Sequence, residues 1–263
     1  MASAPWALIL GASSGFGEAT SLELARSGFN IFGVHLDLRK TIANAERIQE
    51  EIRAQGREAV FFNVNAADAE KRATVIEAIA ERLAGEDETI RVLLHSLAFG
   101  TLLRYIADTP KEAMSRKQLE MTVDVMAHSL VYWTQDLAAR KLLGRGSRIF
   151  AMTSSGSTRV IQSYGGVSAA KAALESHIRQ IAYELAPLGV TANAIRAGVT
   201  DTPGLRRIPG GPELLARARE ANPSGRTTEP QDVASAIAAL ADERLHWMTG
   251  NVLGIDGGED LTA

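Results

Sequence analysis

Gly11-Ala12-Ser13-Ser14-Gly15-Phe16-Gly17 follows the apolar run Trp6–Leu10 and opens a stretch with helical spacing of its apolar residues. Between a strand and a helix, glycines let the backbone turn sharply and approach a pyrophosphate, which the free N–H groups and the dipole of the helix N-terminus stabilise. The spacing is Gly-x-x-x-Gly-x-Gly rather than Gly-x-Gly-x-x-Gly, so a tight turn without a ligand is the alternative. Its place between strand and helix favours a dinucleotide site, with contacts from Gly11, Ser13, Ser14, Gly15, Phe16 and Gly17.

The rest of the chain repeats this alternation of short β-type runs and longer amphipathic stretches, which is typical of a parallel sheet covered by helices on both faces. The predicted strands are 6–10, 30–36, 59–64, 91–97, 147–152, 190–195 and 251–255. The predicted helices are 15–27, 41–55, 68–83, 115–141, 165–186 and 231–241. The pattern predicts a single-domain, Rossmann-like, doubly wound α/β fold over residues 1–263, with a seven-stranded parallel sheet. The Pro- and Gly-rich stretch at about 199–223 is expected to be an irregular, mobile substrate-binding loop.

Composition excludes several classes of protein. The 263 residues include 28 Lys+Arg, 31 Asp+Glu and no cysteine, so disulfides, Cys-ligated metal centres and thiol nucleophiles are absent. The five histidines lack the spacing of metal ligands, and we expect no metal site. The near-neutral charge gives no reason to expect binding to nucleic acid or to an anionic membrane. Because the sequence shows neither a signal peptide nor an apolar run of about 18 residues, we expect a cytoplasmic protein that acts on small molecules.

The residues after the second predicted strand bear on the type of dinucleotide. An acidic residue there accepts hydrogen bonds from the adenosine ribose and repels a 2′-phosphate. His35 stands near that place, and Asp37 could bind an unphosphorylated ribose, whereas Arg39 and Lys40 could hold a 2′-phosphate. We expect NADP(H) rather than NAD(H), with His35 and Arg39 among the coenzyme contacts. The alternative is that Arg39 and Lys40 bind no phosphate and only form the solvated first turn of the next helix.

Several features of the sequence resemble those of the short-chain dehydrogenase/reductase family, and the resemblance covers almost the whole chain. They are the glycine-rich turn, the overall length, and the closing stretch Gly250-Asn251-Val252-Leu253-Gly254-Ile255-Asp256-Gly257-Gly258. The resemblance implies a nicotinamide coenzyme and association into a homotetramer through two long helices. It also implies coenzyme contacts from residues that follow the third, fourth and sixth strands: Asn65, Ala66, Ser96, Leu97, Ala98, Gly198, Thr200 and Thr202.

Three departures from the common family pattern narrow the resemblance. The usual Asn-Asn-Ala-Gly reads His95-Ser96-Leu97-Ala98, the usual helical Asn is Asp124, and Tyr-x-x-x-Lys is replaced by Tyr164-x6-Lys171. All three resemble bacterial enoyl-acyl-carrier-protein reductases, and the segment from Ser154 through Tyr164 to Glu175 looks most like the NADPH-dependent type. The resemblance implies that Tyr164 and Lys171 are catalytic. Ser154 lies 17 residues before Lys171, at the place of the family's catalytic serine, so it is a third candidate; assisting catalysis, ordering a water and lining the pocket are its possible roles.

The wider Tyr–Lys spacing is consistent with enoyl reduction. If Tyr164 continues the helix of Lys171, seven residues place both on one face, about 20° short of two turns and about 10.5 Å apart along the axis. A spacing of four gives a rise of about 6 Å, so the phenol moves one turn further from the nicotinamide ribose that Lys171 would hold. In a ketone the oxygen is on the carbon that receives the hydride, whereas in an enoyl thioester the hydride goes to C3 and negative charge collects on the thioester oxygen, which is attached two carbons further along. A phenol hydroxyl one helical turn further from the nicotinamide ribose is therefore better placed to contact this thioester oxygen.

We therefore expect an enzyme that reduces the trans-2 double bond of enoyl-acyl-carrier-protein or enoyl-CoA thioesters with NAD(P)H in fatty-acid synthesis. The partner is the acyl carrier protein or CoA that bears the substrate, and Arg206 with Arg207 is a candidate basic patch for a carrier protein. The first alternative is a carbonyl reductase or alcohol dehydrogenase of the same family, such as a 3-ketoacyl reductase. The second is a non-catalytic nucleotide-binding regulator.

Overall fold

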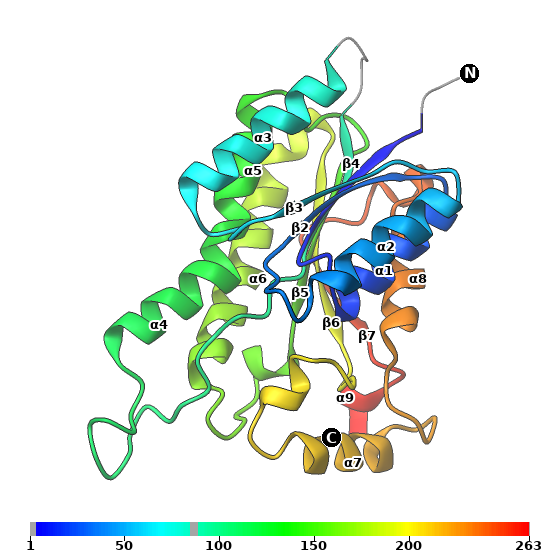
Figure 1. The fold of residues 1–263 in the computed structure, drawn as a ribbon. Coiled ribbons are helices and arrows are strands. Elements are labelled where there is room, and N and C mark those ends of the chain that lie inside the picture. Colours follow the sequence, from blue (N-terminus) through cyan, green and yellow to red (C-terminus); the bar gives the residue numbers. More distant parts are fainter. Residues whose placement is uncertain (1–3, 85–88, 263) are drawn as a thin grey trace.

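The computed structural model describes residues 4–84 and 89–262, and its centre is one seven-stranded parallel sheet (Figure 1). The strand order is β3-β2-β1-β4-β5-β6-β7, which confirms the predicted doubly wound fold. The strands are β1 (Trp6–Leu10), β2 (Asn30–His35), β3 (Ala59–Asn63), β4 (Ile90–His95), β5 (Arg148–Thr153), β6 (Thr191–Ala197) and β7 (Val252–Ile255).

Helices cover both faces of this sheet. The helices α1 (Gly15–Arg26), α2 (Ile42–Ala54) and α8 (Pro230–Leu240) cover one face, and α3 (Ala69–Leu83), α5 (Ser129–Ala139) and α6 (Gly165–Leu185) cover the other (Figure 1). Because side chains of a strand alternate between faces, β1 contributes to both cores. Its Trp6, Leu8 and Leu10 lie in the core with α3, α5 and α6, whereas Ala7 and Ile9 lie in the core with α1, α2 and α8.

Two predicted segments differ from the structure. The single helix expected over 115–141 is α4 (Arg116–Val123), a π-helical turn (Asp124–His128) and then α5. The stretch 199–223 was expected to be irregular, which is wrong: it contains a 3₁₀ turn (Leu205–Arg207) and the helix α7 (Gly211–Ala221). Gly210, at φ +77°, and a proline in the first turn start α7, so the residues that suggested a loop instead mark a helix N-terminus.

The order of the strands fixes where a ligand can bind. From β1 the chain runs outward to β2 and β3, then returns to the other side of β1 and continues from β4 to β7. In sheets of this kind the crevice lies at the carboxyl ends of the strands where the winding reverses. Here α7 and the short helix α9 (Glu259–Thr262) lie beyond that same end (Figure 1). Among the described residues, no helix is long and apolar enough to cross a bilayer.

Candidate active site

The glycine-rich turn after β1 has the close backbone contacts that a dinucleotide cradle requires. A Cβ on Gly11 would lie 2.5 Å from the carbonyl oxygen of Ser96, and one on Gly17 would lie 2.0 Å from the carbonyl oxygen of Gly11. Gly15 starts α1, and the nearest atom to its ideal Cβ is Thr202 Cγ2 at 3.5 Å. Thr202 therefore lies beside the N-terminus of α1, whose free N–H groups could bind a pyrophosphate.

At the end of β2 an acidic side chain faces this turn. His35 Nδ1 lies 2.8 Å from Asp37 Oδ2, and the His35 side chain is only 3% exposed. Burial acts to raise the pKa of Asp37, but hydrogen bonds with the side chains of Ser13, Thr41 and His35 together lower it. Asp37 is therefore a carboxylate held against the phosphate turn, and His35 is its buried partner. Arg39 is exposed.

The predicted residues after β3 lie in a turn away from the main cavity. Asn65 is exposed, and its Oδ1 accepts a hydrogen bond from the backbone N–H of Ala67 at 3.0 Å. Ala66 is buried, and its carbonyl oxygen accepts from Trp133 Nε1 at 2.9 Å. These contacts shape the turn beside the switch point and leave the Asn65 side chain at the surface.

Most of the other predicted site residues line one cavity of about 550 Å³. Its wall is largely apolar, with Leu102, Met126 and Ile161 as examples. The predicted residues that line it are Phe16, Ser96, Leu97, Ala98, Ser154, Tyr164, Lys171, Gly198, Thr200 and Thr202. The structure thus brings the three catalytic candidates together with the residues expected to surround the nicotinamide.

Tyr164 lies at the N-cap of α6, with φ −99° and ψ 0°, and not inside the helix as the spacing argument assumed. Its ring packs on Gly156, where a Cβ would lie 2.7 Å from Tyr164 Cε1. Burial raises the pKa of Tyr164, and a hydrogen bond with the Ser154 side chain only partly opposes this. At neutral pH the phenol is therefore protonated and can donate a hydrogen bond into the cavity.

Lys171 lies in α6, and its side chain is buried. Its Nζ donates a hydrogen bond to the carbonyl oxygen of Met152 at 2.6 Å. Burial lowers the pKa of Lys171 to about 8, and the negative charge of Glu175 acts in the opposite direction. Glu175 is held in turn by Thr153 Oγ1, which donates to Glu175 Oε1 at 2.6 Å. Lys171 is therefore a buried ammonium whose charge is favoured by the nearby carboxylate of Glu175.

His95, at the end of β4, is a second buried group near this ammonium. Ser129 Oγ donates to the carbonyl oxygen of Val125 at 2.7 Å, so it accepts from His95 Nε2 at 2.8 Å. Burial and the positive charge of Lys171 lower the pKa of His95 to about 3, which keeps the imidazole neutral. Asp124 begins the same π-helical turn but lies outside the cavity, where it accepts a hydrogen bond from the Tyr132 hydroxyl at 3.1 Å.

Several residues of the site were not found from the sequence. Arg159, Leu214, Arg217 and Glu259 also line the cavity. Leu214 and Arg217 belong to α7, whose amphipathic spacing was the available signal, whereas Glu259 comes from the short helix after β7 and has no local motif. Within residues 4–84 and 89–262, no group of three or more His, Asp or Glu side chains could hold a metal ion.

The chain is similar in sequence and in fold to several known reductases and dehydrogenases. A 1-cyclohexenylcarbonyl-CoA reductase of Streptomyces collinus is 27% identical over 97% of this chain and 87% of its own length. An NADPH-dependent aldehyde reductase-like protein of Arabidopsis thaliana is 27% identical over 96% of this chain and 93% of its own. The crystal structure of a dehydrogenase/reductase from Sinorhizobium meliloti has a TM-score of 0.83 at 27% identity, with 98% and 96% of the two chains covered.

The family profile described as enoyl-(acyl carrier protein) reductase matches residues 11–259. This range contains the glycine-rich turn, the Tyr164–Lys171 pair and the loops around the cavity. The chain is therefore an oxidoreductase with a nicotinamide coenzyme, and it belongs to the enoyl-(acyl carrier protein) reductase family of short-chain dehydrogenases/reductases.

Proposed function

We propose that the enzyme reduces the C2–C3 double bond of a 2-enoyl thioester. The observation that carries this proposal is the protonated, partly buried phenol of Tyr164 at the wall of a largely apolar cavity, seven residues before the buried ammonium of Lys171. The name of the Streptomyces collinus relative describes a double bond beside a CoA thioester carbonyl, which supports the same reaction class.

The residues of the cavity can stabilise the charge that forms in this reaction. A bound NAD(P)H would supply the hydride for C3, and the electron pair of the C2–C3 double bond would move to the thioester oxygen. Tyr164 donates a hydrogen bond to this oxyanion, a contribution of about 3–4 kcal/mol for one well-placed donor. Lys171 holds the nicotinamide ribose and adds a favourable positive charge. A proton taken up from solvent water at C2 would then restore the thioester carbonyl and give the saturated product.

The cavity also suits the two ends of such a substrate. Apolar residues of the wall can contact an acyl chain, while Arg207 and Arg217 bring positive charge to the same cavity. Both arginines are exposed, and the phosphate groups of CoA or of a carrier protein's phosphopantetheine are anionic. Arg206 is instead paired with Asp201, at 2.8 and 3.0 Å. We therefore propose Arg207 and Arg217, rather than Arg206 with Arg207, as the contacts of the carrier.

The experiment that tests the proposed function compares two thioesters. Oxidation of NADH and of NADPH is followed with crotonyl-CoA and with acetoacetyl-CoA. Faster oxidation with crotonyl-CoA supports enoyl reduction, and consumption of coenzyme with acetoacetyl-CoA alone contradicts it. The carbonyl reductase remains the second candidate because the Ser154–Tyr164 hydrogen bond could serve a carbonyl oxygen. Coenzyme binding without turnover of either thioester, or of a panel of further enoyl and carbonyl compounds, would indicate a regulator.

For the coenzyme, we propose a preference for NAD(H) over the NADP(H) that the sequence suggested. A 2′-phosphate at the end of β2 would meet the Asp37 carboxylate, which hydrogen bonds hold against the phosphate turn, whereas Arg39 is exposed. We expect Asp37→Ser to lower the ratio of kcat/KM for NADH to that for NADPH by about tenfold or more, since one close charge repulsion is worth about 1.4 kcal/mol or more. Steady-state rates with both coenzymes measure the ratio.

A control for Asp37→Ser is Asp68→Ser, which changes an exposed N-cap of α3 and leaves the coenzyme site intact. A ratio that already favours NADPH in the unchanged enzyme would contradict the proposed preference. A ratio that favours NADH but does not move in Asp37→Ser would show that another residue selects the coenzyme.

The rate should fall at alkaline pH because Lys171 loses its charge there. Burial lowers its pKa from 10.5 to about 8, so above this value the ammonium that holds the ribose becomes neutral. Since kcat/KM for the coenzyme reports groups of the free enzyme, its pH profile should decline with an apparent pKa near 8. Glu175→Gln removes the charge that raises this pKa and should move the decline to lower pH. An unchanged decline in Glu175→Gln would assign it to another group.

We also propose that the enzyme is a cytoplasmic homotetramer, as its family resemblance implies. The helices expected to pair between subunits are those of the 116–139 and 165–185 segments, which pack against one another in one subunit. Light scattering after gel filtration measures the mass in solution, and a monomeric mass would contradict the proposal.

A further inference from the structure

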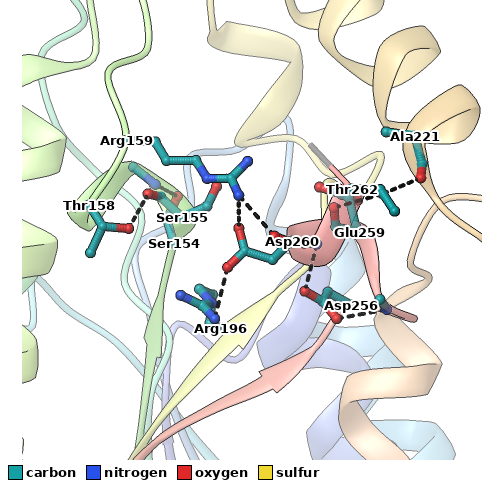
Figure 2. A network of polar contacts seen from close by, with 12 residues as sticks. Ser154, Ser155, Thr158, Arg159, Arg196, Ala221, Asp256, Glu259, Asp260 and Thr262 are labelled. Atoms are coloured by element: carbon teal, nitrogen blue, oxygen red, sulfur yellow. Dashed lines mark hydrogen bonds and ion pairs between the residues drawn. The ribbon is translucent and has the colours of Figure 1, made fainter.

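The segment 256–262 contacts the loop that leads to Tyr164 and the end of β6 (Figure 2). Asp260 lies between two arginines: its Oδ1 is 2.9 Å from Arg159 Nη2 and its Oδ2 is 2.9 Å from Arg196 Nη2. Arg159 also donates to the carbonyl oxygen of Asp260 at 2.9 Å. Arg159 lies five residues before Tyr164, in the connection that begins at Ser154. One carboxylate thus joins this connection to the sheet.

The neighbouring Glu259 holds the turn after β6. The backbone N–H of Val199 donates to both carboxylate oxygens of Glu259, at 3.2 and 3.0 Å. Glu259 is only 8% exposed and lines the same cavity as Tyr164. The approach is so close that a Cβ on Gly198 would lie 2.9 Å from Glu259 Oε2. A second carboxylate of the segment therefore fixes the turn that includes Thr200.

The segment itself is anchored independently of these two contacts. The Asp256 carboxylate accepts from the N–H groups of Gly258 and Asp260, at 2.9 and 3.2 Å. Asn222 Nδ2, just after α7, donates to the carbonyl oxygen of Asp256 at 2.7 Å. The Thr262 hydroxyl donates to the carbonyl oxygen of Ala221 (Figure 2). The segment can therefore act as a fixed support for the two loops.

We propose that Asp260 and Glu259 are positioning residues, which hold the Ser154–Tyr164 connection and the 198–200 turn on opposite sides of the cavity at a fixed separation. The proposal rests on the proposed function, since this separation sets the phenol against the coenzyme side of the cavity. Without the Asp260 charge, Arg159 and Arg196 repel each other with no carboxylate between them. The connection before Tyr164 then loses its link to β6, while the fold, whose cores lie elsewhere, remains.

The test is Asp260→Asn in the full chain, with Asp136→Asn as the matched control. Asp136 also forms a partly buried ion pair, with Arg72 Nε at 2.6 Å, but lies outside the cavity. We expect Asp260→Asn to lower kcat/KM for crotonyl-CoA by about 10- to 100-fold, because small displacements of reacting groups reduce rates by such factors. Hydrogen exchange should become faster in peptides that cover 154–164. The control should change neither quantity.

A double-mutant cycle with Arg159→Gln tests whether the two residues act through each other. If they do, Asp260→Asn in the Arg159→Gln background should change kcat/KM by less than about threefold, because coupled residues are not additive. Additive effects, or unchanged exchange in 154–164, would overturn the positioning role of Asp260. For Glu259→Ala we expect faster exchange at Val199, and unchanged exchange there would overturn its role.

Failure of this inference can be told from failure of the proposed function. If the unchanged enzyme does not reduce crotonyl-CoA, the proposed function fails, yet hydrogen exchange still tests the support of the two loops. If the wild-type enzyme reduces crotonyl-CoA, and Asp260→Asn has the same kcat/KM and the same hydrogen exchange in 154–164, only the positioning role is overturned.

Discussion

Tyr164→Phe is expected to lower turnover of crotonyl-CoA by about 100- to 1000-fold, the effect of removing one donor from a preorganised oxyanion site. The substitution removes one oxygen and keeps the ring that packs on Gly156, so the fold should not change. Because the proposed role of the hydroxyl is toward the substrate and the ring should not move, the dissociation constant of the coenzyme should stay within about threefold. Single-turnover oxidation of NADH and a fluorescence titration measure the two quantities.

The matched control for this variant is Tyr132→Phe. Tyr132→Phe also removes a hydroxyl that donates a hydrogen bond, to Asp124 Oδ1 at 3.1 Å, but Tyr132 does not line the cavity. Its rate should equal that of the unchanged enzyme. Turnover by Tyr164→Phe at the rate of the control would remove Tyr164 from the mechanism, and with it the reason for choosing an enoyl thioester.

Lys171→Met should separate activity from stability. Keeping Lys171 charged in the interior lowers its pKa from 10.5 to about 8, which corresponds to a cost of about 3 kcal/mol at neutral pH. Methionine has a similar length and no charge, so the melting temperature should stay the same or rise despite the loss of the hydrogen bond to Met152. Turnover should fall about 100-fold or more, since the substitution removes the ammonium that we propose to bind the ribose and to stabilise the developing oxyanion.

Thermal unfolding followed by circular dichroism, together with steady-state rates, checks both halves of this prediction. Lys71→Met, which changes an exposed lysine in the first turn of α3, should alter neither rate nor melting temperature. A lower melting temperature with retained turnover in Lys171→Met would show that the buried ammonium serves the fold and not the reaction.

The parts of the fold that depend on local sequence could be predicted. The seven strands were located within about two residues because apolar runs between turn residues are local signals. The glycine-rich turn was found for the same reason. The irregular loop over 199–223 was wrongly predicted because Pro and Gly also occur at helix N-termini, and the fine position of Tyr164 was missed since only the structure shows that α6 begins after it.

The rest of the site depends on contacts between distant segments. Ser154, Tyr164 and Lys171, which line one cavity, could be proposed from the sequence because a family motif connects them within 18 residues. Glu259 and Asp260 reach the same site from the far end of the described chain, and no spacing rule connects Asp260 to Arg159, 101 residues earlier. Likewise, the sequence after β2 indicated His35, Asp37 and Arg39 as candidates for contacts with the coenzyme. Only the structure shows that His35 forms a hydrogen bond with Asp37.

The central place of β1 in the sheet constrains how the chain can fold. β1 pairs with β2 on one edge and with β4 on the other, so its second edge is not covered until the polypeptide has passed residue 90. Contacts between segments so far apart in sequence close slowly, because the entropy of the intervening loop opposes them. During synthesis the glycine-rich turn therefore emerges early but gains its full set of neighbours late, and until β4 has been made β1 exposes an unpaired strand edge that a chaperone could protect.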